Sequence, residues 1–324
     1  MNTNQVQQLE QVTKALKART IRNIYFVACG GSKAIFEPVQ YICDSEIATP
    51  SAVYTANEFV YRSPKGLGAD SLVITCSHSG NTPETVAATA FARKAGALTV
   101  CLSFKPGSPL WEAAEYGVEY TWGPESRPSE SNSAMLYRVV FHVLNILNPN
   151  EKYERALKSV EALDTVIATN RAATIENAIA YGKAYKREQL IYTMSSGACY
   201  GVAYSFAICL LMEMLWTHSQ AIHSGEYFHG PFEITDDNVP FIIILNSGAT
   251  RHLDERALAF AKKYSDRIEV IDTKSFNMEG ICEDLQGYFA PVVAGAVLRQ
   301  YADQLAEQKG HPLSVRRYMW KMEY

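Results

Sequence analysis

The chain of 324 residues lacks the signals that mark several large classes of protein. It has no basic excess, because 34 acidic residues outnumber 30 lysines and arginines, whereas a nucleic-acid-binding surface usually carries clustered positive charge. Its N-terminal segment is polar and lacks the apolar core of a signal peptide. Its most apolar run, residues 202–212, is too short to span a bilayer. The sequence therefore predicts a cytoplasmic protein that binds neither nucleic acid nor membrane.

The sequence also lacks the residue spacings that metal and nucleotide sites require. Its seven cysteines are scattered and form no CxxC pair, and its seven histidines form no HExxH motif. Neither GxGxxG nor GxxxxGKS/T occurs, which argues against a dinucleotide or P-loop site. We therefore expect no metal and no organic cofactor. Most cysteines stand in apolar runs, where a thiol behaves as a small hydrophobe, and for Cys29 this interpretation is favoured over a nucleophile at a strand end.

Short β-branched runs separated by helical patterns make up most of the chain. Apolar runs that are continuous rather than alternating are typical of parallel strands covered by helices on both faces. Thr82 and Pro83 open one predicted helix, residues 133–147 form another, and residues 151–186 form one or two more. This alternation predicts an α/β fold with mostly parallel sheets. The predicted strands are residues 24–28, 72–76, 98–102, 190–194, 241–245 and 268–271.

The chain repeats itself at an offset of about half its length. The segment YFVACG at residues 25–30 recurs as YTMSSG at residues 192–197, and SGNT at residues 79–82 recurs as SGAT at residues 247–250. The two offsets, 167 and 168 residues, agree within one residue, and each match follows a predicted strand. This agreement indicates a duplicated α/β domain. The predicted domains are residues 1–155 and residues 156–324.

Two loops rich in glycine and hydroxyl groups follow the first two predicted strands. Glycines let a ligand approach the backbone, hydroxyls donate hydrogen bonds, and free N–H groups at a helix start attract an anion. Such residues also form ordinary turns and helix caps, but two loops of this kind on successive strands favour a phosphate site at least as much. Their copy at residues 246–250 has one hydroxyl before its glycine, so we expect phosphate binding in the first half alone. The predicted phosphate-binding residues are Gly30, Gly31, Ser32, Ser77, His78, Ser79 and Thr82.

Two titratable residues in the second half are candidates for acid–base chemistry. Glu213 lies in an apolar helical run, where a carboxylate is costly unless it is paired. It is therefore either a general base or a core glutamate bonded to a backbone or arginine partner. His229 lies in a loop framed by glycines and a proline, which favours a functional site, with a surface turn as the alternative. We interpret His218 and His223 nearby as structural or supporting residues.

Taken together, these residues resemble the family of tandem sugar isomerase (SIS) domain proteins, and the chain is similar to the isomerase half of glucosamine-6-phosphate synthase. The resemblance implies two SIS domains, with Glu213 and His229 as the catalytic pair. It also implies a homodimer in which His229 reaches the site of the neighbouring subunit. It further implies that Lys321, in the C-terminal tail where the synthase has a catalytic lysine, binds substrate, and that Ser131 contacts substrate. The motifs that carry the resemblance are CGGS at residues 29–32, SxSGxT at residues 77–82, Glu213, and GExxHGP at residues 225–231.

Within this family the chain is most similar to deglycases of phosphorylated Amadori compounds. The similarity lies in HSGEYFHGPFEITD at residues 223–236 and in RRYMWKMEY at residues 316–324. It implies a phosphorylated sugar-amine substrate, such as 6-phosphofructose-aspartate, that is cleaved through an enaminol to glucose 6-phosphate and the free amino acid. Two alternatives remain open: a phosphosugar aldose–ketose isomerase, which shares this proton-transfer chemistry, and a non-catalytic sugar-phosphate sensor.

Overall fold

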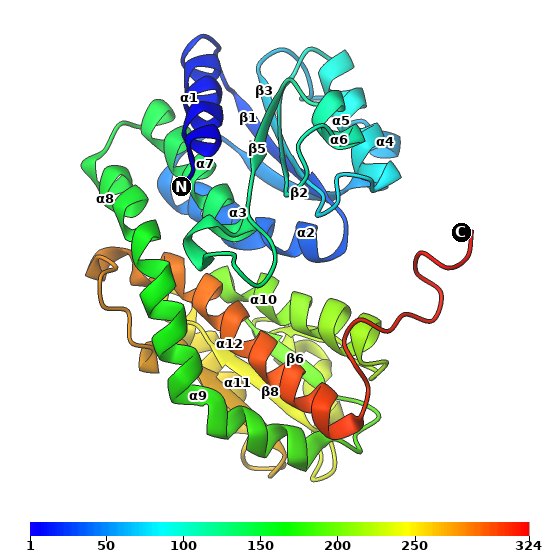
Figure 1. Ribbon diagram of the computed structural model, residues 1–324. Coiled ribbons are helices and arrows are strands. Elements are labelled where there is room, and N and C mark those ends of the chain that lie inside the picture. The colour runs from blue at the N-terminus through cyan, green and yellow to red at the C-terminus, as the bar shows by residue number, and fades with distance from the viewer. Residues whose placement is uncertain (324) are drawn as a thin grey trace. The chain divides into compact units, whose positions relative to one another are not determined.

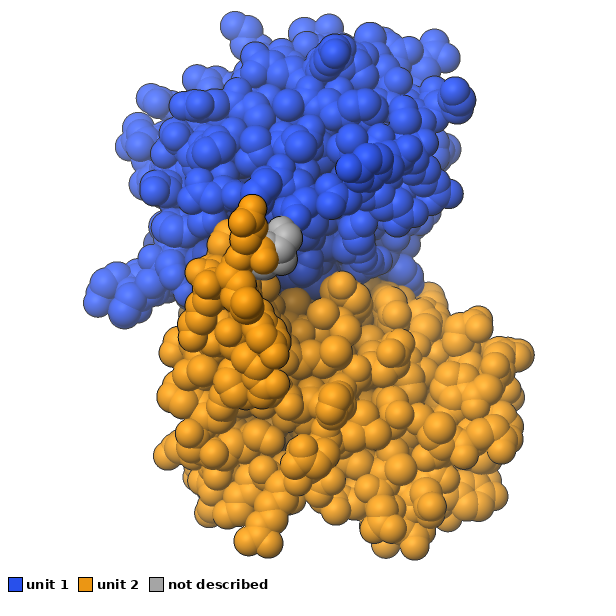
Figure 2. Space-filling view, turned by 90° about the vertical axis from the view of Figure 1, so that its right-hand side faces the viewer, with its two compact units in different colours: residues 1–164, 280–283 blue, residues 165–279, 284–324 orange. Residues whose placement is uncertain are grey.

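The computed structural model describes residues 1–323, which form two compact units (Figure 1). Unit 1 consists of Met1–Asp164 with Gly280–Glu283, and unit 2 consists of Thr165–Glu279 with the chain from Asp284 onward (Figure 2). Along the sequence, the units change over near the start of helix α9 (Leu163–Tyr185). The domain boundary at residue 155 that the sequence suggests remains a prediction.

Unit 1 is built on a parallel sheet with the strand order β2-β1-β3-β4-β5. The central strands β1, β3 and β4 confirm the first three predicted strands, and they are almost wholly buried because helices cover both faces. The edge strands β2 and β5 were not predicted, since they are only half-buried and lack a continuous apolar run. The strands are β1 (Asn23–Ala28), β2 (Ser51–Thr55), β3 (Ser71–Cys76), β4 (Leu98–Ser103) and β5 (Tyr116–Glu119).

Eight α-helices accompany this sheet in the described part of the chain. Helix α7 is the most deeply buried of them, and it packs against α1, α3 and α8. Helices α5 and α7 confirm two predicted helices. The helices are α1 (Thr3–Lys17), α2 (Gly30–Ala34), α3 (Phe36–Glu46), α4 (Ala56–Arg62), α5 (Pro83–Lys94), α6 (Pro109–Ala113), α7 (Asn132–Leu147) and α8 (Glu151–Ser159).

Unit 2 repeats this arrangement with a parallel sheet in the order β7-β6-β8-β9. The first strand of each unit thus lies between the second and the third, which confirms the duplication inferred from the repeated segments. The strands β6, β8 and β9 confirm the last three predicted strands, whereas the short edge strand β7 was not predicted. The strands are β6 (Tyr192–Ser195), β7 (Ala221–His223), β8 (Phe241–Leu245) and β9 (Ile268–Asp272).

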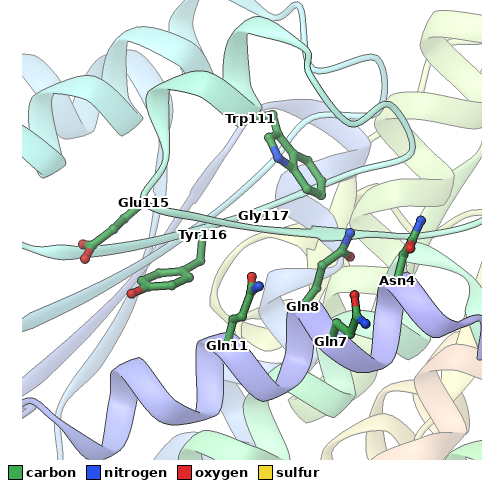
Figure 3. A pocket seen from close by; sticks show the side chains of 8 residues that line it. All are labelled: Asn4, Gln7, Gln8, Gln11, Trp111, Glu115, Tyr116 and Gly117. Carbon is green, nitrogen blue, oxygen red and sulfur yellow. The ribbon is translucent and has the colours of Figure 1, made fainter.

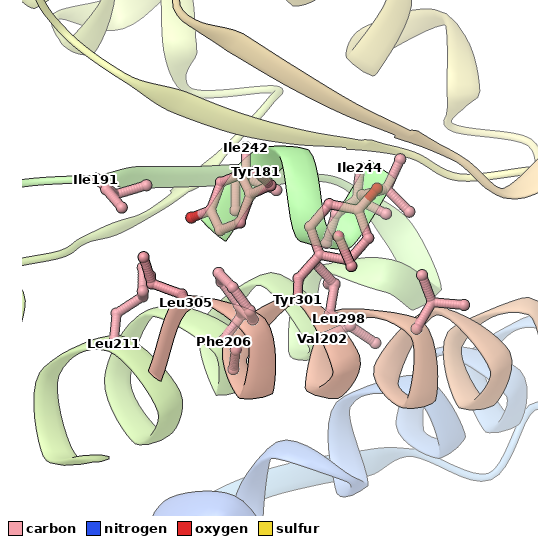
Figure 4. Close-up of a cluster of buried hydrophobic side chains, with 14 of the residues drawn as sticks. Tyr181, Ile191, Val202, Phe206, Leu211, Ile242, Ile244, Leu298, Tyr301 and Leu305 are labelled. Atoms are coloured by element: carbon pink, nitrogen blue, oxygen red, sulfur yellow. The ribbon is translucent and has the colours of Figure 1, made fainter. Parts of the chain in front are cut away.

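The core of unit 2 lies between its sheet and two long helices, α9 and α12 (Gln286–Lys309). Aromatic and aliphatic side chains such as Tyr181, Ile242 and Tyr301 meet there (Figure 4).

The other regular helices of unit 2 are α10 (Tyr200–Ser205), a π-helix (Phe206–Met214) and α11 (Arg251–Ala261). The 3-10 turns are Pro128–Glu130, Val160–Ala162, Gly197–Cys199, Tyr227–His229, Pro231–Ile234, Thr273–Ser275 and Glu283–Leu285.

One helical stretch, Gly197–Met214, is long and apolar enough to cross a membrane by length and composition. It is longer than the apolar run seen in the sequence because the helix begins earlier, at Gly197. Val202, Phe206 and Leu211 on this stretch pack into the core of unit 2 (Figure 4). The stretch is therefore a core helix of that unit.

The turn between β3 and α5 requires glycine at position 80. The φ of Gly80 is +70°, and a Cβ at this position would lie 1.9 Å from the Oγ of Ser108. The N–H of Gly80 donates to the carbonyl of Ser77 at 3.2 Å, and the N–H of Leu110 donates to the carbonyl of Gly80 at 3.0 Å. The turn is thus held on both sides and has no room for a side chain.

We expect Gly80→Ala to lower the free energy of unfolding by about 1–3 kcal/mol, the cost of a non-glycine residue in left-handed backbone. Urea denaturation followed by circular dichroism measures this change. Gly68→Ala is the matched control, because a Cβ there meets nothing within 4 Å. The control should change stability by less than about 0.5 kcal/mol. Equal stability of the two variants would contradict the requirement for glycine.

Candidate active site

The two predicted phosphate loops lie side by side at one edge of the sheet in unit 1. Strands β1 and β3 are parallel neighbours with Ala28 opposite Cys76, so the segments that follow them leave the sheet together. The chain passes from β1 to β2 on one side and returns to β3 on the other. In open α/β sheets, ligands bind at such a reversal, outside the carboxyl ends of the strands.

The first loop presents open backbone. Gly30 has a φ of +53°, and Gly30 and Gly31 are both exposed. A Cβ on Gly30 would meet nothing within 4 Å, so the space beside this backbone is free. Ser32 lies close to the buried thiol of Cys76, whose pKa burial raises to about 12 while a hydrogen bond with Ser32 lowers it. Cys76 is thus a buried, unreactive thiol, whereas Cys29 is half-buried.

The second loop gathers three hydroxyls around the start of α5. The Oγ of Ser77 and the Oγ1 of Thr82 are hydrogen-bonded at 2.8 Å. Thr82 is the N-cap residue of α5, but its side chain does not cap a backbone N–H. The Oγ of Ser79 accepts a long hydrogen bond, 3.3 Å, from the N–H of Asn81. The three hydroxyl groups therefore lie at the N-terminus of α5, which the side chain of Thr82 does not cap. Uncharged donors at a helix N-terminus attract an anion.

His78 stands at the rim of the second loop among aromatic side chains. Its ring centroid lies 4.5 Å from that of Phe104 and 4.6 Å from that of Trp122. Its Nδ1 is hydrogen-bonded to the hydroxyl of Tyr120 at 3.0 Å. Desolvation lowers the pKa of His78, so the imidazole is neutral at neutral pH. No local sequence pattern indicated these three aromatic neighbours, which come from later segments of the chain.

Glu213 lies on the π-helix and is paired with an arginine from the C-terminal tail. Its Oε1 accepts a hydrogen bond from Nε of Arg316 at 3.0 Å. The same oxygen lies 2.8 Å from Nη2 of Arg316, so the two side chains form an ion pair. The Nη1 of Arg316 donates to the carbonyls of Leu313 and Val315, so the guanidinium is itself held by the tail. The sequence left open whether Glu213 is a general base or a core glutamate bonded to a backbone or arginine partner. The structure shows that an arginine partner is present. Burial and the charge of Glu213 raise the pKa of Cys209, one turn earlier, to about 11.

His229 is exposed, and the loop that carries it is anchored by a buried side chain and by hydrogen bonds. Tyr227 is fully buried, and its hydroxyl is hydrogen-bonded to Oγ1 of Thr235 at 2.5 Å. The N–H of His229 donates to the carbonyl of Glu226 at 2.9 Å, and Gly230 follows with a φ of +136°. Within residues 1–323, no hydrogen bond joins His229 to Glu213.

The remaining candidates have local roles in the structure. Ser131 caps α7, since its Oγ accepts from the N–H of Ala134 at 3.3 Å. His223 accepts at Nδ1 from the N–H of Gly225 at 3.1 Å, as expected of a structural residue. Exposed His218 forms an isolated β-bridge. Lys321 is exposed in the tail, where its N–H donates to the carbonyl of Tyr318.

A surface groove of about 370 Å³ lies in unit 1 beside the edge strand β5 (Figure 3). Amide side chains of α1 line it together with Trp111, Glu115 and Tyr116. None of the predicted site residues lines this groove. In the described part of the chain, no group of three or more His, Cys, Asp or Glu side chains could hold a metal ion. That no cofactor is needed remains a prediction.

Comparison with known proteins identifies the family. The SIS domain model matches residues 19–145. The chain is 53% identical over 310 residues to the fructosamine deglycase FrlB of Bacillus subtilis (strain 168), covering 95% of this chain and 94% of that protein. It is 28% identical over 330 residues to the fructoselysine 6-phosphate deglycase of Escherichia coli (strain K12), covering 97% of this chain and 94% of that protein.

Solved structures agree with these sequence matches. The crystal structure of a Bacillus subtilis protein described as a phosphosugar isomerase superimposes on 98% of this chain with a TM-score of 0.96, at 51% identity and over 97% of that chain. The α/β fold and the resemblance to SIS-domain proteins, which was inferred from the loop motifs, Glu213 and residues 225–231, are thereby confirmed. The resemblance to deglycases, which was inferred from residues 223–236 and 316–324, is confirmed as well. The chain belongs to the fructosamine deglycase family of SIS-domain proteins.

Proposed function

We propose that this protein is a deglycase that cleaves a 6-phosphorylated fructose–amino acid to glucose 6-phosphate and the free amino acid. The observation that carries the proposal is 53% identity to a fructosamine deglycase over 95% of the chain. The hydroxyl-lined loops at the β1/β3 reversal supply donors for the sugar phosphate, which this substrate class requires. We propose further that the enzyme is a cytoplasmic homodimer with no metal or organic cofactor.

In the proposed reaction the phosphate is held by Ser77, Ser79, Thr82 and the exposed backbone of Gly30 and Gly31. An anchored phosphate positions the rest of the substrate and converts the chemistry into an effectively intramolecular step. Because His78 is neutral at neutral pH, it contributes a hydrogen bond or a contact surface rather than a positive charge. The anion is thus bound by neutral dipoles.

The proposed chemistry needs only proton transfers and water. His229 assists ring opening by moving a proton at the ring oxygen. Glu213 then removes a proton from C1 to give a 1,2-enaminol, and protonation at C2 gives the imine of glucose 6-phosphate. Water adds to the imine, and the amino acid leaves as the free amine. A single carboxylate can shuttle a proton between adjacent carbons in this way.

The ion pair with Arg316 gives Glu213 a fixed orientation for this task. The guanidinium of Arg316 is held by two tail carbonyls, and its contacts with Glu213 are both to Oε1. The other carboxylate oxygen, Oε2, is thus outside the ion pair. We therefore propose that Oε2 is the atom that receives the proton. Arg316 then acts on the reaction by holding Glu213.

The amino acid on the substrate is proposed to be aspartate, because the segments at residues 223–236 and 316–324 resemble enzymes for 6-phosphofructose-aspartate. A phosphosugar isomerase is the second candidate, since a structure described in those words is 51% identical to this chain. A non-catalytic sensor is the third. Incubation with 6-phosphofructose-aspartate, 6-phosphofructose-lysine and fructose 6-phosphate separates all three. A deglycase releases amine and glucose 6-phosphate from a conjugate, an isomerase converts only fructose 6-phosphate, and a sensor converts none.

Replacement of Ser79 and Thr82 by alanine should raise KM strongly, because each lost hydrogen bond to a charged group costs about 1.5–3 kcal/mol. Steady-state kinetics and calorimetric titration with glucose 6-phosphate measure the effect. Ser247→Ala, at the position that corresponds to Ser79 in unit 2, is the control and should leave KM unchanged. Unchanged affinity in the Ser79/Thr82 double variant would end the idea that this loop binds phosphate.

The Glu213→Gln variant keeps the shape of the side chain but removes the base, so kcat should fall by about 10²–10⁴-fold with little change in KM. His229→Ala should behave likewise. If His229 acts across a dimer interface, mixing the two inactive variants should restore part of the activity, since each mixed dimer holds one intact site. Turnover near the wild-type rate in either single variant would remove that residue from the mechanism.

Arg316→Ala should lower kcat about 10-fold if the ion pair positions the base, and Arg316→Lys should recover part of the loss. In a Glu213→Gln background the same change should cost nothing further, because there is no base left to position. Arg317→Ala is the control, since Arg317 lies over the ring of Trp216 instead. Independent, multiplicative losses from Arg316 and Glu213 would contradict the coupling.

A further inference from the structure

We propose that Asp254 is a positioning residue. Its buried carboxylate lies between the two loops of unit 2 that correspond to the proposed phosphate loops of unit 1, and it holds the loop at residues 223–231 in place. Because that loop carries His229, the inference rests on the proposed function. Asp254 lies in the first turns of α11 and is fully buried. It stands one turn beyond the SGAT match at residues 247–250.

Asp254 is the centre of a polar cluster at the ends of β6 and β8. Its Oδ2 accepts hydrogen bonds from the backbone N–H of Asn246 at 2.9 Å and from Nδ2 of Asn246 at 2.5 Å. The same Nδ2 lies 3.0 Å from Oγ of Ser196 and 3.1 Å from Oγ1 of Thr250. Ser196 and Thr250 are also hydrogen-bonded to each other at 3.1 Å. The polar groups of this cluster therefore satisfy one another.

The cluster occupies the place in unit 2 that the phosphate loops occupy in unit 1. Ser196 follows β6 and Asn246 follows β8, and these strands are parallel neighbours in the same order as β1 and β3. The loop glycines match as well, since φ is +53° at Gly30 and +54° at Gly197. At the offset of 168 residues, the counterpart of Asp254 is the apolar Val86. Unit 1 thus leaves its loops free for an external anion, whereas unit 2 supplies an anion of its own.

Asp254 also reaches directly into the loop that carries His229. Its Oδ1 accepts a hydrogen bond from Oγ of Ser224 at 2.6 Å, and both residues are buried. The N–H of Ser224 donates to the carbonyl of Ser195 at 2.9 Å, which fixes the same residue from the sheet. Two residues beyond Asp254 on α11, the guanidinium carbon of Arg256 lies 4.0 Å from the ring centre of Phe228. Helix α11 therefore holds this loop at two points.

The charge of Asp254 is compensated by hydrogen-bond donors. Within residues 1–323 no cation forms an ion pair with it, and its three donors come from Asn246 and Ser224. A buried carboxylate is tolerated only when such donors surround it. Removing the carboxylate would leave the backbone N–H of Asn246 without this acceptor and release Ser224 from α11. The position of the loop therefore depends on this side chain.

The test compares Asp254→Ala, Asp254→Asn and Ser224→Ala by hydrogen–deuterium exchange and by kinetics. Asp254→Ala and Ser224→Ala should speed amide exchange in the peptide 223–231 about 10-fold and lower kcat about 10-fold, with KM within about 2-fold. Asp254→Asn should lose less, since its oxygen can still accept from Asn246 and its NH₂ can donate to Ser224. The double variant should lose no more than either single one. Formate should restore part of the protection in Asp254→Ala but none in Ser224→Ala.

Ser195→Ala is the matched control, because it removes an equally buried hydroxyl, bonded to the carbonyl of Ile244, that does not touch Asp254. It should leave exchange in the loop and kcat unchanged. If Asp254→Ala fails to fold, Ser224→Ala carries the test, because it breaks the same contact from the other side. Wild-type exchange and kcat in Ser224→Ala would overturn the proposal. Exchange in the loop reports on positioning even if the wild-type protein cleaves no Amadori compound, so failure of the proposed function is recognised separately.

Discussion

The parallel pairing of β1 with β3 is the constraint on which the proposed phosphate site depends. It places Ala28 opposite Cys76, so the two loops that follow leave the sheet at one edge. Each loop alone is a common turn, but together they bring exposed backbone and hydroxyls to the same end of the sheet. The proposed sugar-phosphate site thus depends on the order of strands in the sheet.

The second unit shows how the same topology can serve another purpose. It keeps the strand order and the left-handed glycine after its first strand, yet the loops there are joined by an internal network. One difference in sequence accounts for much of this contrast, since unit 2 has the carboxylate of Asp254 where unit 1 has the apolar Val86. In unit 2 the copy of the proposed phosphate loops is thus proposed to be a structural support, and the loop that it would support carries the histidine proposed for catalysis.

The sequence was sufficient for the central elements because buried parallel strands are continuous apolar runs and glycine-rich loops are local. It was not sufficient for the edge strands β2, β5 and β7, which are short or only half-buried. The partner of Glu213 also could not be predicted, since Arg316 lies 103 residues away along the chain. The same holds for the aromatic side chains around His78 and for the contact between Asp254 and Ser224, 30 residues apart. Side-chain pairs that the fold alone brings together leave no local pattern.

The measurement that tests the central claim most directly is a crystal structure of the protein with glucose 6-phosphate bound. We expect the phosphorus atom at the β1/β3 reversal, with the hydroxyls of Ser77, Ser79 and Thr82 and the backbone of Gly30 and Gly31 within hydrogen-bond distance of the phosphate oxygens. We expect no anion beside Asn246 and Asp254. A phosphate bound in the second unit, or one bound away from both loops of the first, would contradict it.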